Sequence, residues 1–259
     1  MQLHITRQAR IRLIVFLALA GIVAALVLPP LRQPQGYHRF ADERTLLGVP
    51  NFCDVVSNGG FLVVGLWGLV WLGRKSPATQ SSFVMAGERW PYMVFFFGVF
   101  LTCFGSGYYH WKPEDATLVC DRLPMTLGFM SLLAATVAER ISVRVGLWML
   151  LPLVVAGIAS VWWWQRTGNL WPYAAAQYWS LLLIVLMLAL FSPRYTRGSD
   201  LACATGFYVL AKIAEALDEQ IFHVLRVVSG HSLKHLITAV ATFWILRMLM
   251  KRSERRNQN

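Results

Sequence analysis

Residues 90–111 read WPYMVFFFGVFLTCFGSGYYHW, and this stretch decides the fold. Between its terminal tryptophans it contains no Asp, Glu, Lys or Arg. A helix needs about 20 apolar residues to cross the hydrocarbon core of a bilayer, and tryptophan is enriched at membrane interfaces. The stretch therefore predicts a transmembrane helix, and two polar residues near its end, Ser106 and His110, need a separate explanation.

Similar apolar stretches occur along the whole chain of 259 residues, of which 56% are hydrophobic and 14% are charged. Soluble domains average about 45–50% apolar and about 25% charged residues, so this composition excludes a disordered chain and disfavours a soluble enzyme. The expected membrane spans are residues 11–28, 51–73, 91–109, 118–138, 145–164, 171–192, 202–222 and 232–250. We therefore expect an all-α polytopic membrane helix bundle. No small-x-small cleavage motif follows the first span closely, so we interpret it as an uncleaved signal-anchor helix.

The positive charges predict the orientation of the bundle. The chain has 24 Lys and Arg residues against 13 Asp and Glu residues, a net charge of +11. In a soluble protein this would suggest nucleic acid, but here it fits the enrichment of Lys and Arg in cytoplasmic loops. With the N-terminus inside, the inner segments and helix ends hold 15 of the 24 and the outer ones hold 8. The inner segments are 1–10, 74–90, 139–144, 193–201 and 251–259.

This pattern predicts a multi-pass protein with both termini in the cytoplasm. The short loops, and a C-terminus without a retrieval signal, favour a bacterial-type plasma membrane. The sequence indicates the bilayer as a partner, no nucleic acid and no obligate protein partner.

Ionisable residues at the outer ends of three spans suggest a metal site. Such residues are costly within a membrane and are usually functional. His231 and His235 are four residues apart and share one helix face, which is a good chelate for a divalent metal. His110 and Asp121 are expected at the same depth. A single intramembrane histidine is more often a hydrogen-bonded core residue, but three at one depth match a catalytic zinc site with an open position.

These residues and their neighbours resemble the alkaline ceramidase family. The matching motifs are Gly105-Ser106-x-x-Tyr109-His110, Asp121-x-Leu123-Pro124-Met125, His231-x-x-x-His235 and Asn51-Phe52-x-Asp54-Val55-Val56-Ser57-Asn58. The family belongs to a superfamily of seven-helix membrane hydrolases that also includes the progestin and adipoQ receptors. The resemblance runs from about residue 40 to about residue 245. It implies a seven-helix core over residues 51–250, after an N-terminal transmembrane helix and outside loop (1–50) and before a basic cytoplasmic tail (251–259).

The resemblance also implies an activity and a site. Family members hydrolyse ceramides, a class of sphingolipid, to a long-chain base and a fatty acid. Zinc would be held by His110, His231 and His235. Asp121 would accept a proton from the water that zinc activates, and Ser106 would hydrogen-bond to the substrate carbonyl. The alternatives are a helix-packing role for Ser106 and a helix-terminal acid at Asp121.

Two departures from the family pattern affect the site. Arg122 replaces a glutamate in the Asp-Glu-Leu-Pro-Met run of the family. Asn51 stands where members with a calcium site have a glutamate, although Asp42 and Glu43 precede it. A neutral amide is a weaker ligand for a hard dication, so calcium binding is doubtful.

Other functional classes remain open. Receptors of the superfamily share the same serine, aspartate and histidines, so a receptor-like or signalling protein on this scaffold is one alternative. A haem-binding or ion-transporting helix bundle is another. The short loops favour an enzyme that acts on lipid, and a histidine pair on one helical turn fits zinc better than haem.

Three further groups of polar residues need an interpretation. Lys212, Glu215, Glu219 and His223, with Asp218 beside them, would form one stripe on a continuous helix, either a proton or water route or, as we favour, a self-neutralising structural cluster. Asn51, Asp54 and Asn58 form a second stripe that either bonds across helices or supports the metal ligands. The four cysteines, Cys53, Cys103, Cys120 and Cys203, form no Cys-x-x-Cys pair and are expected to be small buried hydrophobes.

Overall fold

The computed structural model describes residues 6–74 and 76–255, and all of the regular structure in this part of the chain is helical. The expected all-α class is therefore confirmed. Two of the basic residues used to predict the orientation, Lys75 and Arg256, lie outside the described residues, as does the end of the expected tail.

Seven helical segments in the described residues are long and apolar enough to cross a membrane. The protein therefore has the build of an integral membrane protein. The segments are α1 (Arg7–Val27), α2 and α3 (Phe52–Ser57 and Gly59–Gly73), α5 (Arg89–Trp111), α6 (Asp115–Arg140), α7 (Val143–Thr167), α8 to α9 (Trp171–Ala174, η3 at Ala175–Trp179, Ser180–Leu190) and α12 (Gly230–Lys251). The remaining helices are η1 (Gln35–His38), α4 (Pro77–Ser81), η2 (Ala86–Glu88), α10 (Ser199–Ala216) and α11 (Asp218–Leu225).

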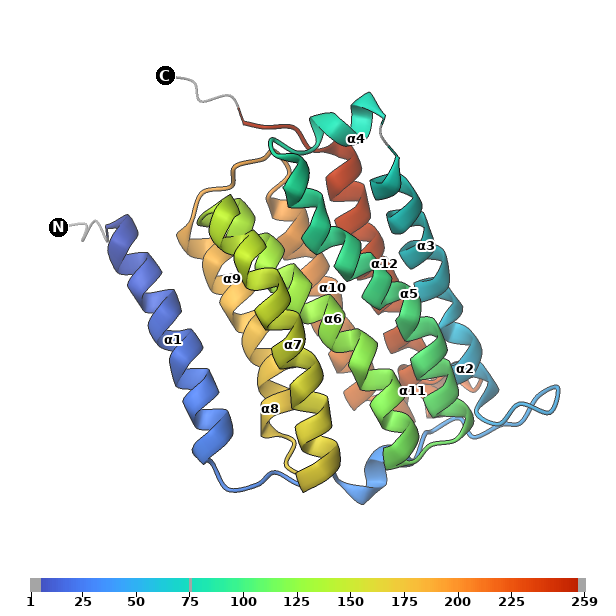
Figure 1. Cartoon of the computed structure of the whole chain (residues 1–259). Coiled ribbons are helices and arrows are strands. Elements are labelled where there is room, and N and C mark those ends of the chain that lie inside the picture. The colour runs from blue at the N-terminus through green and yellow to red at the C-terminus, as the bar shows by residue number, and fades with distance from the viewer. Residues whose placement is uncertain (1–5, 75, 256–259) are drawn as a thin grey trace.

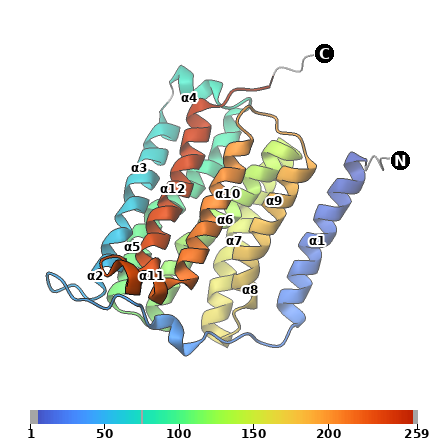
Figure 2. The ribbon, with the colours of Figure 1, turned by 180° about the vertical axis from the view of Figure 1, so that it is seen from behind.

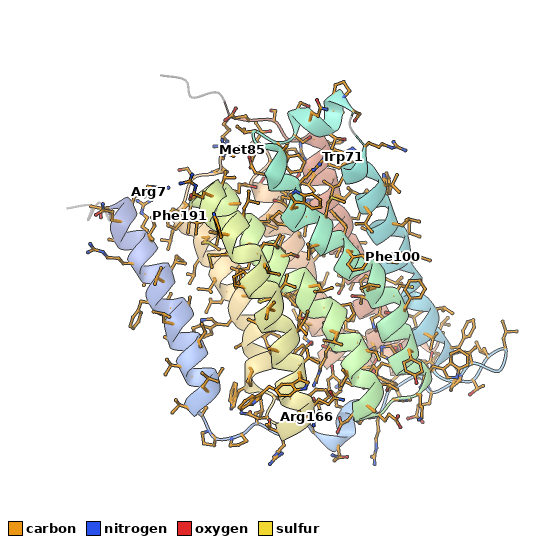
Figure 3. The ribbon with its side chains drawn as sticks, in the orientation of Figure 1. Arg7, Trp71, Met85, Phe100, Arg166 and Phe191 are labelled. Carbon is orange, nitrogen blue, oxygen red and sulfur yellow. The ribbon has the colours of Figure 1, made fainter. Side chains whose placement is uncertain are left out.

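The helices lie side by side in one bundle, with α1 at its edge (Figure 1). Figure 3 shows Trp71, Met85 and Phe191 at one end of the bundle and Arg166 at the other. We call the first the tail end, because α12 finishes there, and the second the histidine end, because α5 ends and α12 begins there (Figures 1 and 2).

The expected span over residues 202–222 is wrong as a continuous helix. The chain leaves helical geometry at Leu217, where φ is −103° and ψ is 26°, and this divides α10 from α11. Because the helix ends there, Lys212 and Glu215 no longer share a stripe with Glu219 and His223, which are exposed on α11. The predicted four-residue stripe is therefore wrong. Even so, α10 runs along the bundle between α12 and α9 (Figure 2).

The α5–α6 contact, which positions the site, depends on a glycine. A Cβ atom at Gly105 would lie 2.0 Å from the carbonyl oxygen of Cys120, so only glycine permits this approach of the two backbones. Gly107 on the same helix faces no such neighbour within 4 Å. Close packing at Gly105 brings the last turn of α5 against the first turns of α6.

Buried charges join several segments at the tail end. Arg252 follows α12 and donates to Glu139 of α6 at 3.2 Å and to the carbonyl oxygen of Ser82 at 2.9 Å. Its guanidinium carbon lies 4.1 Å from the ring centre of Tyr195, whose hydroxyl donates to Glu88 at 2.6 Å. These contacts connect the end of α12 to α6 and to both neighbouring loops.

All four cysteines are free, in agreement with the absence of paired spacing. Their expected burial is wrong: Cys120 and Cys203 are exposed, and Cys53 and Cys103 are half-buried. Thiols on the outer faces of a membrane bundle meet lipid rather than water, so an apolar residue gains little there by burial.

Candidate metal centre

Three histidines meet at the histidine end of the bundle. His110 belongs to the last turn of α5, whereas His231 and His235 occupy the first two turns of α12. One nitrogen of each ring lies within 4.8 Å of the others, and the exposed fractions are 1%, 7% and 3%. Among the described residues this is the only group of its kind. The convergence predicted from the sequence is thus present, and the group could hold a metal ion.

The hydrogen bonding of His110 fits a metal ligand. Both of its ring nitrogens are buried and have no hydrogen-bond partner among the described residues. Buried polar atoms without partners are rare because their desolvation is costly. A metal ion would supply the missing partner for one of these nitrogens.

His235 is oriented by a hydroxyl group. Its Nδ1 atom lies 2.8 Å from Oγ of Ser57, which leaves Nε2 for a metal. An outer partner of this kind fixes both the tautomer and the ring plane of a ligating histidine. Sequence reasoning did not single out Ser57, because only the rotation of α2 shows that it faces α12.

The polar residues of α2 support the same centre. Asn51 donates to the carbonyl oxygen of His110 at 2.8 Å, and Asp54 accepts from the hydroxyls of Ser229 and Ser232 at 3.2 and 2.6 Å. Ser229 caps α12, so Asp54 stabilises the helix start that carries two of the histidines. Asn51 and Asp54 of the predicted stripe therefore bond across helices and support the histidines, whereas Asn58 donates only to the carbonyl oxygens of Asp54 and Val55 in its own segment.

His231 has a charged neighbour. Its Nε2 atom lies 2.7 Å from Nζ of Lys234, and Lys234 also pairs with Glu215 at 3.0 Å. Glu215 pairs in addition with Lys212, so a carboxylate between two ammonium groups lies beside the histidines. This pairing within the bundle is the self-neutralising arrangement expected for Lys212 and Glu215.

Ser106 and Asp121 lie on the wall of a cavity of about 320 Å³, and His235 lines the same cavity. Ser106 is buried on α5 and Asp121 is half-buried on α6. The carboxylate of Asp121 interacts with the Ser106 hydroxyl across the contact that Gly105 permits. The remaining wall is mainly apolar and comes from α3, α5, α6, α10, α12, the run from α8 through η3 to α9, and the segment around η1.

The segment between α1 and α2 covers the histidines. The ring centre of Phe40 lies 4.7 Å from that of His110 and 4.9 Å from that of His231. Asp218 fixes this segment, since one carboxylate oxygen accepts the amide of Ala41 at 3.0 Å and the other accepts the amide of His231 at 2.7 Å. Neither Phe40 nor Asp218 was identified as a site residue, because sequence spacing does not show where a loop packs.

The residues considered for calcium are engaged elsewhere. Both carboxylate oxygens of Asp42 accept from Arg44, at 2.7 and 2.6 Å, and Glu43 is exposed. The Arg44 guanidinium holds the pKa of Asp42 below its usual range, mainly through these hydrogen bonds. Arg44 also donates to the carbonyl oxygen of Val227 at 2.7 Å. The described residues therefore do not fit a calcium site, and Asp42 instead fastens the covering segment.

A scan against protein-family models gives no match for this chain, and a search of curated proteins finds none that is similar enough to count. The interpretation of the site therefore depends on its own geometry.

Proposed function

We propose that the protein is a zinc-dependent hydrolase that cleaves the amide bond of N-acyl lipids within the membrane. The observation that carries this proposal is one cavity wall on which Ser106, Asp121 and His235 occur together, with His110 and His231 beside His235. A donor set of three neutral imidazoles suits zinc and leaves a position open for substrate.

The residues of the chain have complementary roles in this proposal. A zinc ion held by three histidines supplies Lewis acidity and makes water acidic enough to react near neutral pH. Asp121 takes up the proton that the attacking water releases and delivers it to the leaving amine. The hydroxyl of Ser106 donates to the carbonyl oxygen as negative charge develops there.

The cavity supports a lipid as substrate. Aromatic and aliphatic side chains such as Phe95, Val99 and Leu132 line the part of the cavity that extends into the bundle. An acyl chain would lie against this apolar wall, while the amide faces Ser106 and Asp121. A ceramide-type lipid could enter sideways from the bilayer, so no soluble carrier is required.

For the membrane arrangement, we propose that α10 is an eighth crossing. It has 18 residues and follows the length of the bundle, and its charges pair within the fold. Both termini are then cytoplasmic in a bacterial-type plasma membrane, and the histidine end faces outward.

Metal content is the first test. Detergent-purified wild type should hold one zinc per chain, measured by elemental analysis after removal of loosely bound metal. His231→Ala should lose it, because two imidazoles bind zinc far more weakly than three. His223→Ala is the matched control, since this histidine is exposed on α11 and should leave the stoichiometry unchanged. Folded wild-type protein without zinc would contradict the proposal.

The second test separates binding from chemistry. Asp121→Asn should retain zinc but reduce hydrolysis of a fluorescent ceramide by at least about 100-fold, the usual contribution of a general acid–base group. Turnover near the wild-type rate in this variant would remove Asp121 from the mechanism. If wild type holds zinc but cleaves neither ceramide nor other N-acyl lipids, the hydrolase assignment fails.

A further inference from the structure

A buried cation in the cavity has no role in the function proposed above. Arg122 follows Asp121 on α6, lines the same cavity and is only 3% exposed. Among the described residues it forms no ion pair, not even with Asp121. Burial of a guanidinium without a carboxylate is expensive, so its presence calls for a compensating interaction.

Aromatic rings and a side-chain amide hold the guanidinium in place, and Asp121 lies near enough to interact with it without forming an ion pair. Its carbon atom lies 3.9 Å from the ring centre of Trp164 and 4.6 Å from that of Tyr173. Nη2 donates to the side-chain oxygen of Gln33, which precedes η1. Nη1 is buried and donates to no acceptor among the described residues. The guanidinium is therefore held rigidly and is charged, and its Nη1 atom remains available to donate a hydrogen bond.

The other cations of the cavity are different. Lys212 and Lys234 share the carboxylate of Glu215, so both are paired within the protein. Of the three cations, Arg122 is the one that forms no ion pair among the described residues, whereas the two lysines share one carboxylate. A planar guanidinium with a free N–H matches a carboxylate or a phosphate, whose oxygens accept such donors in parallel.

We propose that Arg122 binds the acidic group of an anionic amphiphile whose alkyl chain fills the cavity. The ligand chemistry is an oxyanion, carboxylate or phosphate, joined to a long apolar chain. This inference rests on the proposed function in one respect: it makes the substrate an N-acyl lipid whose head group bears an acidic group beside the amide. Binding of the anion itself requires neither zinc nor hydrolysis.

The test is a binding measurement on the full-length protein in neutral detergent. Dodecanoate, dodecyl phosphate and the neutral alcohol dodecanol share one chain length and differ only in the polar group. Affinity is read from the shift in melting temperature and from titration of tryptophan fluorescence. Wild type should bind at least one of the two anions about 10- to 100-fold more tightly than dodecanol, the range given by a charge-assisted hydrogen bond. The anion that binds more tightly shows whether the acidic group of the natural ligand is a carboxylate or a phosphate.

Three variants test whether Arg122 causes the preference for anions over dodecanol. Arg122→Gln should lose the preference and melt at the same or a higher temperature without ligand, since an unpaired buried charge has been removed. Arg122→Lys keeps the charge without the planar fork and should retain a weaker preference. Arg166→Gln is the control, because Arg166 also stacks on a tryptophan, Trp162, but is exposed outside the cavity.

Each outcome either supports or overturns the proposal that Arg122 binds an anion. Equal binding of anions and dodecanol by wild type overturns the proposal, whatever happens to the variants. An unchanged preference in Arg122→Gln also overturns it. A marked drop in the melting temperature of both Arg122 variants, with no anion preference in wild type, assigns Arg122 a structural stacking role. The two proposals fail separately: a protein without zinc or amidase activity can still prefer the anion, and a ceramidase without that preference disproves only this inference.

Discussion

At the residue scale, each histidine of the candidate metal centre is positioned by a different contact. Ser57 reaches the ring of His235, Asp218 accepts the backbone amide of His231, and Asn51 donates to the backbone carbonyl of His110. Contacts behind the ligands fix the ligand geometry before the metal arrives, and their loss typically weakens metal binding.

Ser57→Ala should lower zinc affinity about 10-fold without changing the stoichiometry at saturating zinc, because the ring of His235 loses its outer partner. Competition with a fluorescent chelator measures the affinity. Ser160→Ala is the matched control, since Ser160 is buried but bonds only to its own helix through the carbonyl of Gly157. Equal affinities in the two variants would deny Ser57 a positioning role.

The convergence of the three histidines could be predicted from the sequence, whereas the contacts that support them could not. His231 and His235 are four residues apart, and helix geometry alone places them on one face. Ser57 depends on how α2 is rotated against α12, and Phe40 depends on the path of an irregular segment. Neither is encoded by spacing within a single element.

At the element scale, the contact between α5 and α6 sets the distance between Ser106 and Asp121. The two backbones approach at Gly105, where a Cβ atom would collide with the carbonyl oxygen of Cys120. A collision with backbone cannot be relieved by a side-chain rotation, so the helices would have to separate.

Gly105→Ala should therefore lower the unfolding free energy by about 1–3 kcal/mol and reduce amide hydrolysis more than zinc binding. Gly107→Ala provides the comparison, because open space faces that position and alanine is the better helix former. Thermal melts and turnover of the two variants give the answer. Similar losses in both would show that α5 and α6 tolerate the extra methyl group.

The covering segment before α2 should loosen in acid. Its anchor Asp42 has a pKa below the value of the unfolded chain, so the ion pair with Arg44 stabilises fully above about pH 4. That contribution is lost as the pH falls through the lowered pKa. Asp42→Asn should melt about 2–4 °C below wild type, because loss of the ion pair lowers the free energy of unfolding by about 1 kcal/mol.

The difference in melting temperature between wild type and Asp42→Asn shows the direction of this pH dependence. It should be constant from pH 7 to pH 5 and shrink below about pH 4, as Asp42 itself becomes protonated in wild type. Melting curves across this range measure it. A difference that grows in acid would mean that the folded protein is stabilised by the protonated carboxyl of Asp42. That result would contradict the assignment.

The positions of most helices were predictable because apolar length and charge distribution are local properties. The break at Leu217 was not, since it depends on Asp218 bonding to Ala41 and His231, which are distant in the sequence. The pattern of polar residues continues through the break with helical spacing, so periodicity alone predicted one stripe where the structure has two helices.

At the scale of the whole molecule, the two ends of the bundle serve different purposes. The histidine end holds the three histidines beside a cavity, whereas at the tail end Arg252 is paired and stacked, with contacts to α6 and to both neighbouring loops. Functional sites often keep costly groups that other parts of the fold must compensate. The tail end provides such compensation.

Arg252→Gln should therefore destabilise the protein without altering the site. Removing one partner of a buried ion pair costs about 3–5 kcal/mol, or about 10 °C in melting temperature for a chain of this size. Lys251→Gln, an exposed neighbour, should change little. Zinc stoichiometry should be equal in all three proteins, and its loss in Arg252→Gln at low temperature would show that the two ends are coupled.

The separation of the histidines along the chain has a consequence for biosynthesis. His110 on α5 emerges from the ribosome well before His231 and His235, which belong to α12. The donor set is therefore complete only when α12 has been inserted beside α5. An ion held by all three histidines would bind only after that step, and it would then link α5 to α12.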